Sequence, residues 1–303
     1  MLNSKILYYF VTIVEHGSYT KAAQALGIAQ SALSIAIRKF EQKIGVTILH
    51  RSSKGVTVTK EGEVLLTHAK TILSKINDAQ IAIDELRGLK KGEVKIGIPS
   101  MMGSYFFPEI LMAFKFKYPD INLSIVESGT QTIREKLLNG ELDLGVIVND
   151  HLPDELQARH VITSQMVAAV GTNHPLAGLK KLDYGTFFEQ ELVMFKVGYF
   201  HREVIDKLCQ QYQHSAKYSF ETNLLAMMLN IVKNEFAITA LLELVTDREP
   251  EVLGIPFEEP VYLDLALAWR KEGYLSIANR RFVDFTLNEV NEKGLSSSPS
   301  GKH

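Results

Sequence analysis

Polar side chains recur every three to four positions between residues 30 and 38. Gln30, Ser31, Ser34 and Arg38, together with the apolar Ile35, would share one edge of an α-helix. Glutamine can form two hydrogen bonds with adenine, serine can donate or accept one, and an apolar side chain can contact a thymine methyl group. The spacing therefore predicts a helix edge that reads base pairs, and the alternative is an ordinary solvated surface.

Further candidate contacts to nucleic acid lie outside this helix. Arg51 and Lys54 enclose two serines and precede Gly55, a composition typical of a tight turn. Cations at a hairpin tip suit phosphates or the minor groove, although an ordinary hairpin with solvated cations has the same residues. Thr20 is expected to cap a short helix. The predicted DNA contacts are Thr20, Gln30, Ser31, Ser34, Ile35, Arg38, Arg51 and Lys54.

A second group of candidate residues follows the strands predicted in the remainder of the chain. Ligands of α/β folds bind at the carboxyl ends of strands, in the cleft between subdomains. Backbone N–H groups and hydroxyls there suit a carboxylate, and Met101 and Met102 indicate a partly apolar small molecule. Each position could also be an ordinary turn or capping residue. The expected effector contacts are Ser100, Met101, Met102, Gly103, Gly129, Thr130, Val148, Asn149, Phe200, His201 and Thr222.

The charge of the chain is unevenly distributed. Residues 1–60 hold eight lysines and arginines and two acidic residues, whereas the remainder holds 25 basic and 33 acidic residues. A basic segment joined to an acidic body favours a polyanionic partner for the basic segment alone. Chance clustering on a solvated surface is the alternative.

The elements that would position the first group are three short helices. Apolar periodicity predicts helices from about Ser4 to Glu15, from Thr20 to Leu26 and from Gln30 to about Lys43. Ala23 is small enough for two helices to cross closely, and Leu33 would fill the space between them. This arrangement is typical of a helix-turn-helix, whose second helix enters the major groove.

Two short strands are expected after the third helix, at residues 46–49 and 56–58. They would form a β-wing and complete an N-terminal all-α winged helix-turn-helix. The next helix, within residues 60–90, is capped by Thr59, although Gly62 weakens its first turn.

The long helix carries apolar residues separated alternately by four and three positions. A strict seven-residue repeat over three heptads is typical of a two-helix coiled coil. Pairing would let two recognition helices read an inverted repeat, and packing on the helix's own chain is the alternative. The predicted dimerisation seam is Leu65, Ala69, Ile72, Ile76, Ala79, Ile83 and Leu86.

Strand-like and helix-like segments alternate from Glu93 onward, which favours parallel strands joined by right-handed crossovers. The pattern predicts a C-terminal α/β domain of two subdomains, like a periplasmic binding protein, with crossings near residues 162–164 and 266–268. Strands are expected near residues 94–98, 121–126, 142–148, 166–170, 192–195, 236–239 and 261–270.

These elements divide the chain into four predicted parts. Residues 1–59 form the DNA-binding domain, residues 60–90 the coiled-coil linker, and residues 91–295 the effector-binding domain. Within it, subdomain I takes about residues 91–162 and 268–295, and subdomain II about residues 163–267. Residues 296–303 are expected to form a disordered tail.

Several functional classes are disfavoured by what the sequence lacks. It has no phosphate-binding loop, nucleophile elbow or His-Glu-x-x-His motif, so we expect no enzyme activity, no cofactor and no metal site. Its one cysteine, Cys209, cannot form an intrachain disulfide. No apolar stretch approaches the ~18 residues that cross a bilayer. We therefore expect a cytoplasmic protein without a signal peptide or membrane contact.

Taken together, the N-terminal residues resemble the LysR-type transcriptional regulators. The body resembles the family at Gly92, Tyr118, Pro119, residues 140–144 and residues 174–176. Ser31 stands where the family often has proline, and Ile35 where a basic residue is common. The N-terminal matches are Phe10, residues 17–20, Ala22, Ala23, Leu26, residues 30–34, Ile37, Glu41, Gly45, Arg51, Thr59 and Gly62.

The resemblance implies a tetramer, built as a dimer of dimers, that binds promoter DNA. It implies that a small-molecule co-inducer changes DNA bending, with RNA polymerase as a further candidate partner. It also places Gln30, Ser31, Ser34, Arg38 and Arg51 at DNA-contacting positions of the family.

Two other classes of protein are weighed against this one. A solute-binding protein or small-molecule enzyme with incidental N-terminal helices would be expected to have a signal sequence or a catalytic constellation. An architectural nucleoid protein would have no use for a cleft domain.

Overall fold

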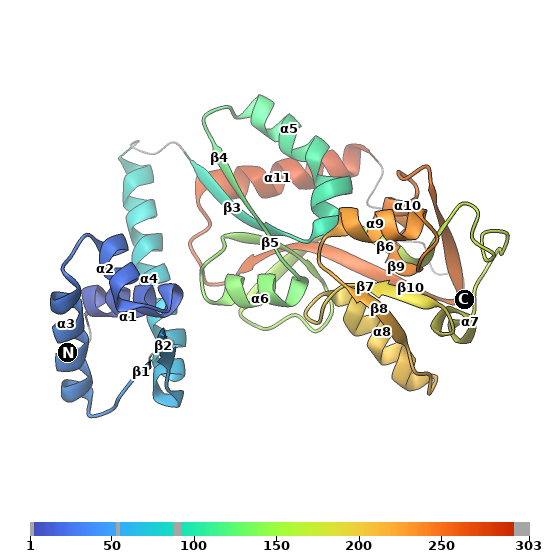
Figure 1. Ribbon diagram of the computed structural model, residues 1–303. Helices are drawn as coiled ribbons and strands as arrows, with labels where there is room; N and C mark the ends of the chain where they lie inside the picture. The colour runs from blue at the N-terminus through green and yellow to red at the C-terminus, as the bar shows by residue number, and fades with distance from the viewer. Residues whose placement is uncertain (1–2, 53–54, 88–91, 294–303) are drawn as a thin grey trace. The chain divides into compact units, whose positions relative to one another are not determined.

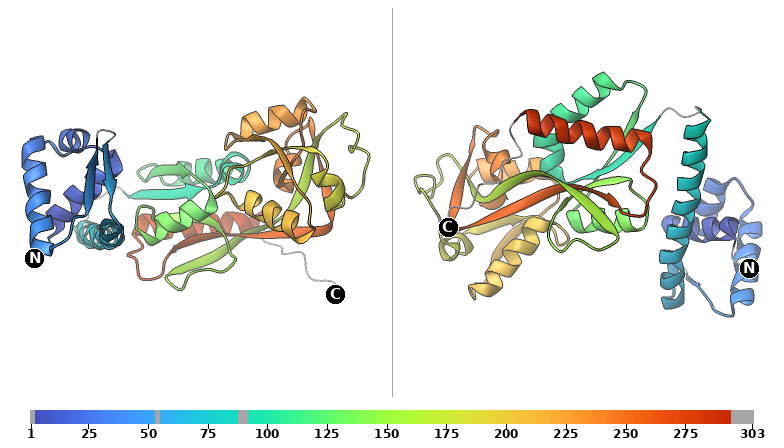
Figure 2. Two further views of the ribbon diagram at one scale, coloured as in Figure 1. Left: turned by 60° about the horizontal axis from the view of Figure 1, so that its bottom comes forward. Right: turned by 180° about the vertical axis from the view of Figure 1, so that it is seen from behind.

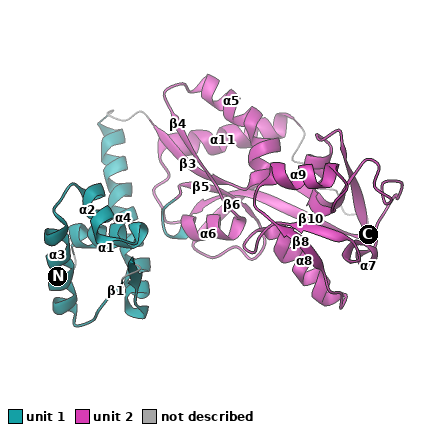
Figure 3. Cartoon of the chain, in the orientation of Figure 1, with its two compact units in different colours: residues 1–90, 138–141 teal, residues 91–137, 142–303 magenta. Residues whose placement is uncertain are grey.

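The computed structural model describes residues 3–52, 55–87 and 92–293. The chain divides into two compact units, one of residues 1–90 with residues 138–141 and one of residues 91–137 with residues 142–303 (Figure 3). The predicted contact Lys54 and the predicted tail, residues 296–303, lie outside the described residues.

Three helices and a two-stranded hairpin form the core of the N-terminal unit (Figure 1). Phe10, Leu33 and Ile37 are completely buried at its centre, and Ala23 is also buried. The helices agree with the predicted ones to within two residues at each end. The elements are α1 Ser4–His16, α2 Tyr19–Leu26, α3 Gln30–Ile44, β1 Leu49–Ser52 and β2 Gly55–Val58.

Glycines end α1, α2 and α3. Gly17, Gly27 and Gly45 have φ values of 58°, 65° and 75°, which side-chain-bearing residues rarely adopt. The N-cap of α2 is Ser18, whose hydroxyl accepts a hydrogen bond from the Lys21 N–H. The predicted capping role of Thr20 is therefore wrong, because Thr20 lies inside the helix and a cap must precede the first helical residue.

The wing begins later than predicted. The first strand starts at Leu49 rather than residue 46, because the preceding segment is attached to α3 instead of pairing. The Glu41 carboxylate accepts hydrogen bonds from the N–H groups of Ile48 and Leu49, at 2.9 and 3.3 Å. Pairing then runs from Leu49 opposite Val58 to the turn.

A single long helix, α4 (Lys60–Leu86), follows the wing. Thr59 caps it as predicted, since its hydroxyl accepts from the Gly62 N–H at 2.9 Å. Gly62 does more than weaken the first turn: a Cβ there would lie 2.2 Å from the Ile48 carbonyl oxygen. Only glycine lets the helix approach the wing this closely.

The second unit is built on a mixed six-stranded sheet in the order β4-β3-β5-β10-β6-β9. As predicted, β3 pairs in parallel with both β4 and β5. β10 is antiparallel to β5 and β6, and β6 is antiparallel to β9. The strands are β3 Glu93–Ile98, β4 Asn122–Glu127, β5 Leu144–Val148, β6 Leu156–Gly171, β9 Thr239–Leu242 and β10 Val252–Arg270.

Helices cover both faces of the parallel part of this sheet (Figure 1). On one face α5 (Phe107–Lys117) packs on α11 (Ile277–Glu292), with Phe114 and Phe282 ring centroids 4.9 Å apart. On the other face lies α6 (Thr130–Leu138), which approaches the strands closely. A Cβ on Gly145 would come within 2.4 Å of the Ile133 side chain. These three strands and three helices are called the first lobe below.

The second lobe combines the β9 end of the long sheet with a parallel pair, β7 Glu191–Met194 and β8 Lys217–Glu221. β8 was not predicted, because its alternating polar and aromatic residues lack a β-branched core face. β9 begins three residues later than predicted, after the left-handed Glu235 turns the chain. The helices are α7 Tyr184–Phe188, α8 Phe200–Gln211, α9 Leu225–Lys233 and α10 Glu243–Thr246.

The antiparallel pair β6–β10 runs along the whole second unit and joins the two lobes (Figure 2). Its register shifts between Leu265 and Ala266. Within the described ranges, every helix is too short or too polar to span a bilayer.

Candidate nucleic-acid interface and effector pocket

The two faces of α3 differ sharply. Leu33 and Ile37 are buried, whereas Gln30, Ser31, Ile35 and Arg38 are exposed. Ile35 is 52% exposed, so this edge presents a large apolar side chain among its polar ones. The structure therefore leaves one helix edge free with the mixed polar and apolar character that base recognition needs.

Ser34 does not belong to that free edge. It is buried, and its hydroxyl accepts a hydrogen bond from Arg51 Nη2 at 2.9 Å. The Arg51 guanidinium also lies 4.0 Å from the centroid of the Tyr19 ring, a cation–π contact. The prediction of an exposed Ser34 is therefore wrong, and Arg51 connects the wing to both α2 and α3.

The seam predicted on α4 has two parts. Leu65 is half-buried and Ala69 completely buried, and both belong to the N-terminal core of their own chain. For these two residues the structure therefore supports the alternative prediction, that the helix packs on its own chain. The remaining seam residues are exposed: Ile72 (40%), Ile76 (48%), Ile83 (51%), Leu86 (89%) and Ala79.

A pocket of about 110 Å³ lies beside α6 and α8 in the second unit. Three predicted effector contacts line it, namely Thr130, Val148 and Phe200. Four further lining residues were not predicted from the sequence. Two of them could have been, because Arg134 lies one helical turn after Thr130 and Glu203 one turn after Phe200, on the same helix faces. The additional lining residues are Gln131, Arg134, Asp150 and Glu203.

Arg134 connects this pocket to the carboxyl end of β5. Its Nη2 donates to the carbonyl oxygens of Val148 and Asp150, both at 3.0 Å, and to Asp150 Oδ1 at 3.2 Å. Its Nε is buried and has no partner among the described residues. The guanidinium is thereby held in one orientation, with donor capacity remaining.

The other predicted effector contacts lie outside the pocket. Ser100 Oγ and His201 Nε2 are buried and have no hydrogen-bond partner within the described ranges. Burial lowers the pKa of His201 to about 3, so the ring is neutral near pH 7. Asn149 is exposed and donates to Asp264 Oδ2 at 3.1 Å. Met101, Met102 and Thr222 are buried, and Gly103 is half-buried.

The lobes touch near Gly129. A Cβ on Gly129 would lie 2.3 Å from the carbonyl oxygen of Gly198, so the two backbones are in contact. Beside them, Tyr199 Oη in the second lobe donates to Glu127 Oε1 in the first, at 2.8 Å. Burial, and then this carboxylate, raises the pKa of Tyr199.

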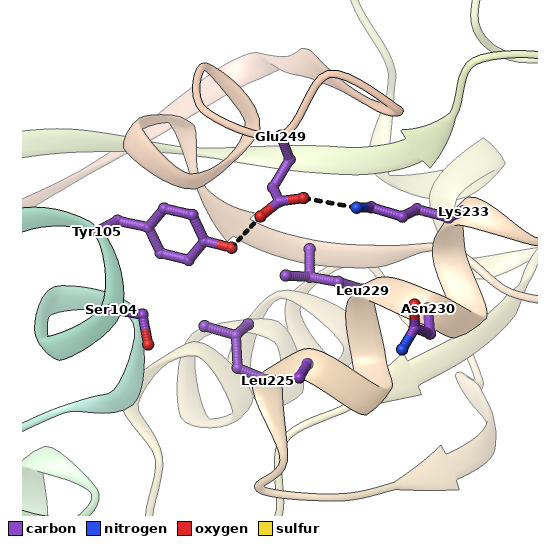
Figure 4. Close-up of a pocket in the computed structure, with 8 residues that line it drawn as sticks. Ser104, Tyr105, Leu225, Leu229, Asn230, Lys233 and Glu249 are labelled. Atoms are coloured by element: carbon purple, nitrogen blue, oxygen red, sulfur yellow. Dashed lines mark hydrogen bonds and ion pairs between the residues drawn. The ribbon is translucent and has the colours of Figure 1, made fainter.

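A larger pocket, of about 240 Å³, lies between the π-helix η1 (Met102–Phe106) and α9 (Figure 4). Tyr105 donates from its hydroxyl to Glu249, which also pairs with Lys233 at 2.7 Å. None of the predicted effector contacts lines it. Glu249 and Lys233 pair with each other, so the described lining leaves no unpaired charge for a ligand.

Two family models together match nearly the whole chain. The model of the bacterial regulatory helix-turn-helix protein, lysR family, matches residues 5–63, and that of the LysR substrate-binding domain matches residues 87–291. The chain belongs to the LysR family. This LysR-family transcriptional regulator therefore combines a helix-turn-helix DNA-binding domain with an effector-binding domain.

Full-length relatives agree with this assignment. The protein is 28% identical over 283 residues to the HTH-type transcriptional regulator YwbI of Bacillus subtilis, covering 92% of this chain and 94% of YwbI. Its fold is similar to a full-length OxyR variant from Pseudomonas aeruginosa, with a TM-score of 0.69 and 21% identity over 96% of this chain and 95% of that one.

A third relative has been solved on DNA. The full-length regulator CbnR in complex with its target DNA has a TM-score of 0.64 and 19% identity, over 95% of this chain and all of that chain. In this LysR-family chain, no group of three or more metal-ligating side chains occurs within the described residues.

Proposed function

We propose that this LysR-family regulator binds promoter DNA through α3, as a dimer or a tetramer, and responds to a small molecule held between its lobes. The observation that carries the proposal is the free edge of α3. Gln30, Ser31, Ile35 and Arg38 are exposed together, while the opposite face of the same helix is buried. A helix with this division can enter the major groove without loss of core packing.

Self-association would use the exposed part of the α4 seam, from Ile72 to Leu86. Four large apolar side chains there are between 40% and 89% exposed, at coiled-coil spacing. Pairing would bury them and present two copies of α3 to an inverted repeat. The further association of dimers into a tetramer belongs to the same proposal.

The effector would bind in the pocket beside α6 and α8, since both lobes line it. A ligand that contacts two lobes can shift the balance between their arrangements. A regulator of promoters acts in the cytoplasm, and RNA polymerase is the further partner that we propose. The proposal includes no enzymatic step, cofactor or metal.

Replacement of Gln30 tests the DNA-reading role. Gln30→Ala should weaken binding to the protein's own promoter region about 10- to 100-fold, the cost of one lost base-reading pair, and leave random DNA unaffected. Gln42→Ala is the matched control, because Gln42 is exposed farther along α3. Fluorescence anisotropy at several salt concentrations measures both affinities. Equal losses on specific and random DNA would contradict base reading.

The α4 seam is tested by a charged substitution. Ile76→Lys should convert the purified protein to monomers or weaken its association, as measured by sedimentation velocity, because a lysine pair would replace an apolar contact. Val64→Lys is the control, since Val64 is 63% exposed but lies off the seam. Unchanged association in Ile76→Lys would contradict pairing along this helix.

A further inference from the structure

The pocket beside α6 and α8 carries different chemistry on its two walls. The first lobe contributes Thr130, Gln131 and Arg134 from α6, and the second contributes Phe200 and Glu203 from α8. A ligand that fills the pocket must therefore satisfy both walls at once.

The first-lobe wall is suited to a carboxylate. Nη2 of Arg134 is engaged and Nε is buried, so Nη1 is left to donate to a carboxylate, which would share the guanidinium with Asp150. Guanidinium groups pair with carboxylates through charge-assisted hydrogen bonds. The Thr130 hydroxyl and the Gln131 amide, which line the same wall, supply neutral donors.

The second-lobe wall is suited to a cation. Glu203 is half-buried, and its carboxylate has no ion-pair partner within the described ranges. Asp150 is already paired with Arg134 at 3.2 Å, so one negative charge of the pocket is left unbalanced. The Phe200 ring lies in the same lining, and an aromatic face adds to the attraction of an ammonium group.

The pocket is small: its volume of about 110 Å³ is below the roughly 300–1,000 Å³ of sites for drug-sized ligands, which favours a small ligand. We propose that the pocket binds a small amino acid, with its carboxylate at Arg134 and Thr130 and its ammonium group at Glu203 and Phe200. This inference rests on the proposed effector-responsive function and names the chemical class of the effector.

Titration calorimetry on the full-length protein tests the proposal with small probes. Glycine, L-alanine and L-serine carry both groups, propionate lacks the ammonium group, and ethylamine lacks the carboxylate. We expect at least one amino acid to bind at millimolar concentration or below. Propionate and ethylamine should each bind about 10- to 100-fold more weakly, because propionate leaves Glu203 without a cation and ethylamine leaves Arg134 Nη1 without an acceptor.

Variants locate the binding to this pocket. Glu203→Gln should weaken amino-acid binding about 10- to 100-fold, and Glu203→Asp, which keeps the charge, should restore part of it. Glu189→Gln is the matched control, because it removes one negative charge from an exposed position outside the pocket lining. Near-ultraviolet circular dichroism on each variant reports whether the fold is retained.

Three results would overturn the inference. Propionate or ethylamine could bind as tightly as alanine, Glu203→Gln could bind amino acids as tightly as Glu189→Gln, or none of the amino acids could bind. Promoter binding by the same preparation separates this failure from failure of the proposed function. Intact promoter binding without amino-acid binding contradicts the inference alone, whereas absent promoter binding contradicts the proposed function.

Discussion

The proposed DNA-reading edge of α3 and the proposed effector pocket are built in different ways. The edge belongs to one small core, and its exposed residues stand on a helix whose other face is fixed by Leu33 and Ile37. The pocket is assembled from two lobes, and two predicted effector contacts outside its lining, Ser100 Oγ and His201 Nε2, are buried without a described partner. The α3 edge is therefore already exposed to a partner. The effector-binding domain, in contrast, holds buried polar atoms that form no hydrogen bond with the described residues.

The largest expected effect tests the rigidity of the N-terminal unit. Gly62→Ala should lower its free energy of unfolding by about 3 kcal/mol, since the added Cβ meets the Ile48 carbonyl and cannot move past backbone. Gly103→Ala, in the effector-binding domain, should change stability by less than about 0.5 kcal/mol, because its Cβ would have an ordinary contact at 3.6 Å. Urea unfolding measures the stability of both variants. Equal losses of stability would contradict the expected difference between the two positions.

The next effect concerns the buried ring of His201. Its pKa is about 3 in the folded protein, against about 6.5 when unfolded, so the stability that neutral His201 provides is complete above pH 6.5 and is lost as the pH falls toward 3. Between pH 7 and pH 5 the loss should be about 2 kcal/mol. His201→Leu should remove this part of the acid sensitivity.

The control for that measurement is His68→Gln, at an exposed position on α4. It should keep the full acid sensitivity in urea unfolding at the two pH values. If His201→Leu keeps it as well, the ring is not held neutral by burial.

A smaller effect separates the positive charge of Arg51 from its contacts with Ser34 and Tyr19. Arg51→Ala should weaken DNA binding and reduce the slope of log affinity against log salt by about one, as expected for one lost phosphate contact. Arg51→Lys keeps the charge but loses the Ser34 hydrogen bond and the Tyr19 stacking, so binding should fall by about 1 kcal/mol with the slope unchanged. The same slope in Arg51→Ala and the parent protein would exclude a phosphate contact.

The smallest expected effect is on stability in Ser100→Ala. Because no described group bonds to the buried hydroxyl, its removal should change the free energy of unfolding by less than about 0.5 kcal/mol. A large loss of stability would show instead that the hydroxyl has a structural partner.

The sequence was most informative where structure is local. The three N-terminal helices, their glycine ends and the buried stripe of α3 follow from helical periodicity and from the low cost of positive φ in glycine. The parallel pairing of β3 with β4 and β5 follows from alternating elements.

Contacts between distant residues were harder to foresee. The hydrogen bond between Arg51 and Ser34 joins elements 17 residues apart, and no local pattern records it. Likewise, the pocket uses Arg134 and Glu203, whose importance depends on how the lobes meet. The burial of Ala69 shows the same limit, since a heptad repeat does not distinguish a partner's helix from the chain's own core.

The contact of Gly129 with Gly198 sets a mechanical stop. Because the two backbones are already in contact there, the lobes cannot approach further at that point. Any motion that brings the lobes closer elsewhere must therefore rotate about this contact. An alanine at position 129 would push the two backbones apart. The absence of a side chain at Gly129 therefore sets how closely the lobes approach at this point.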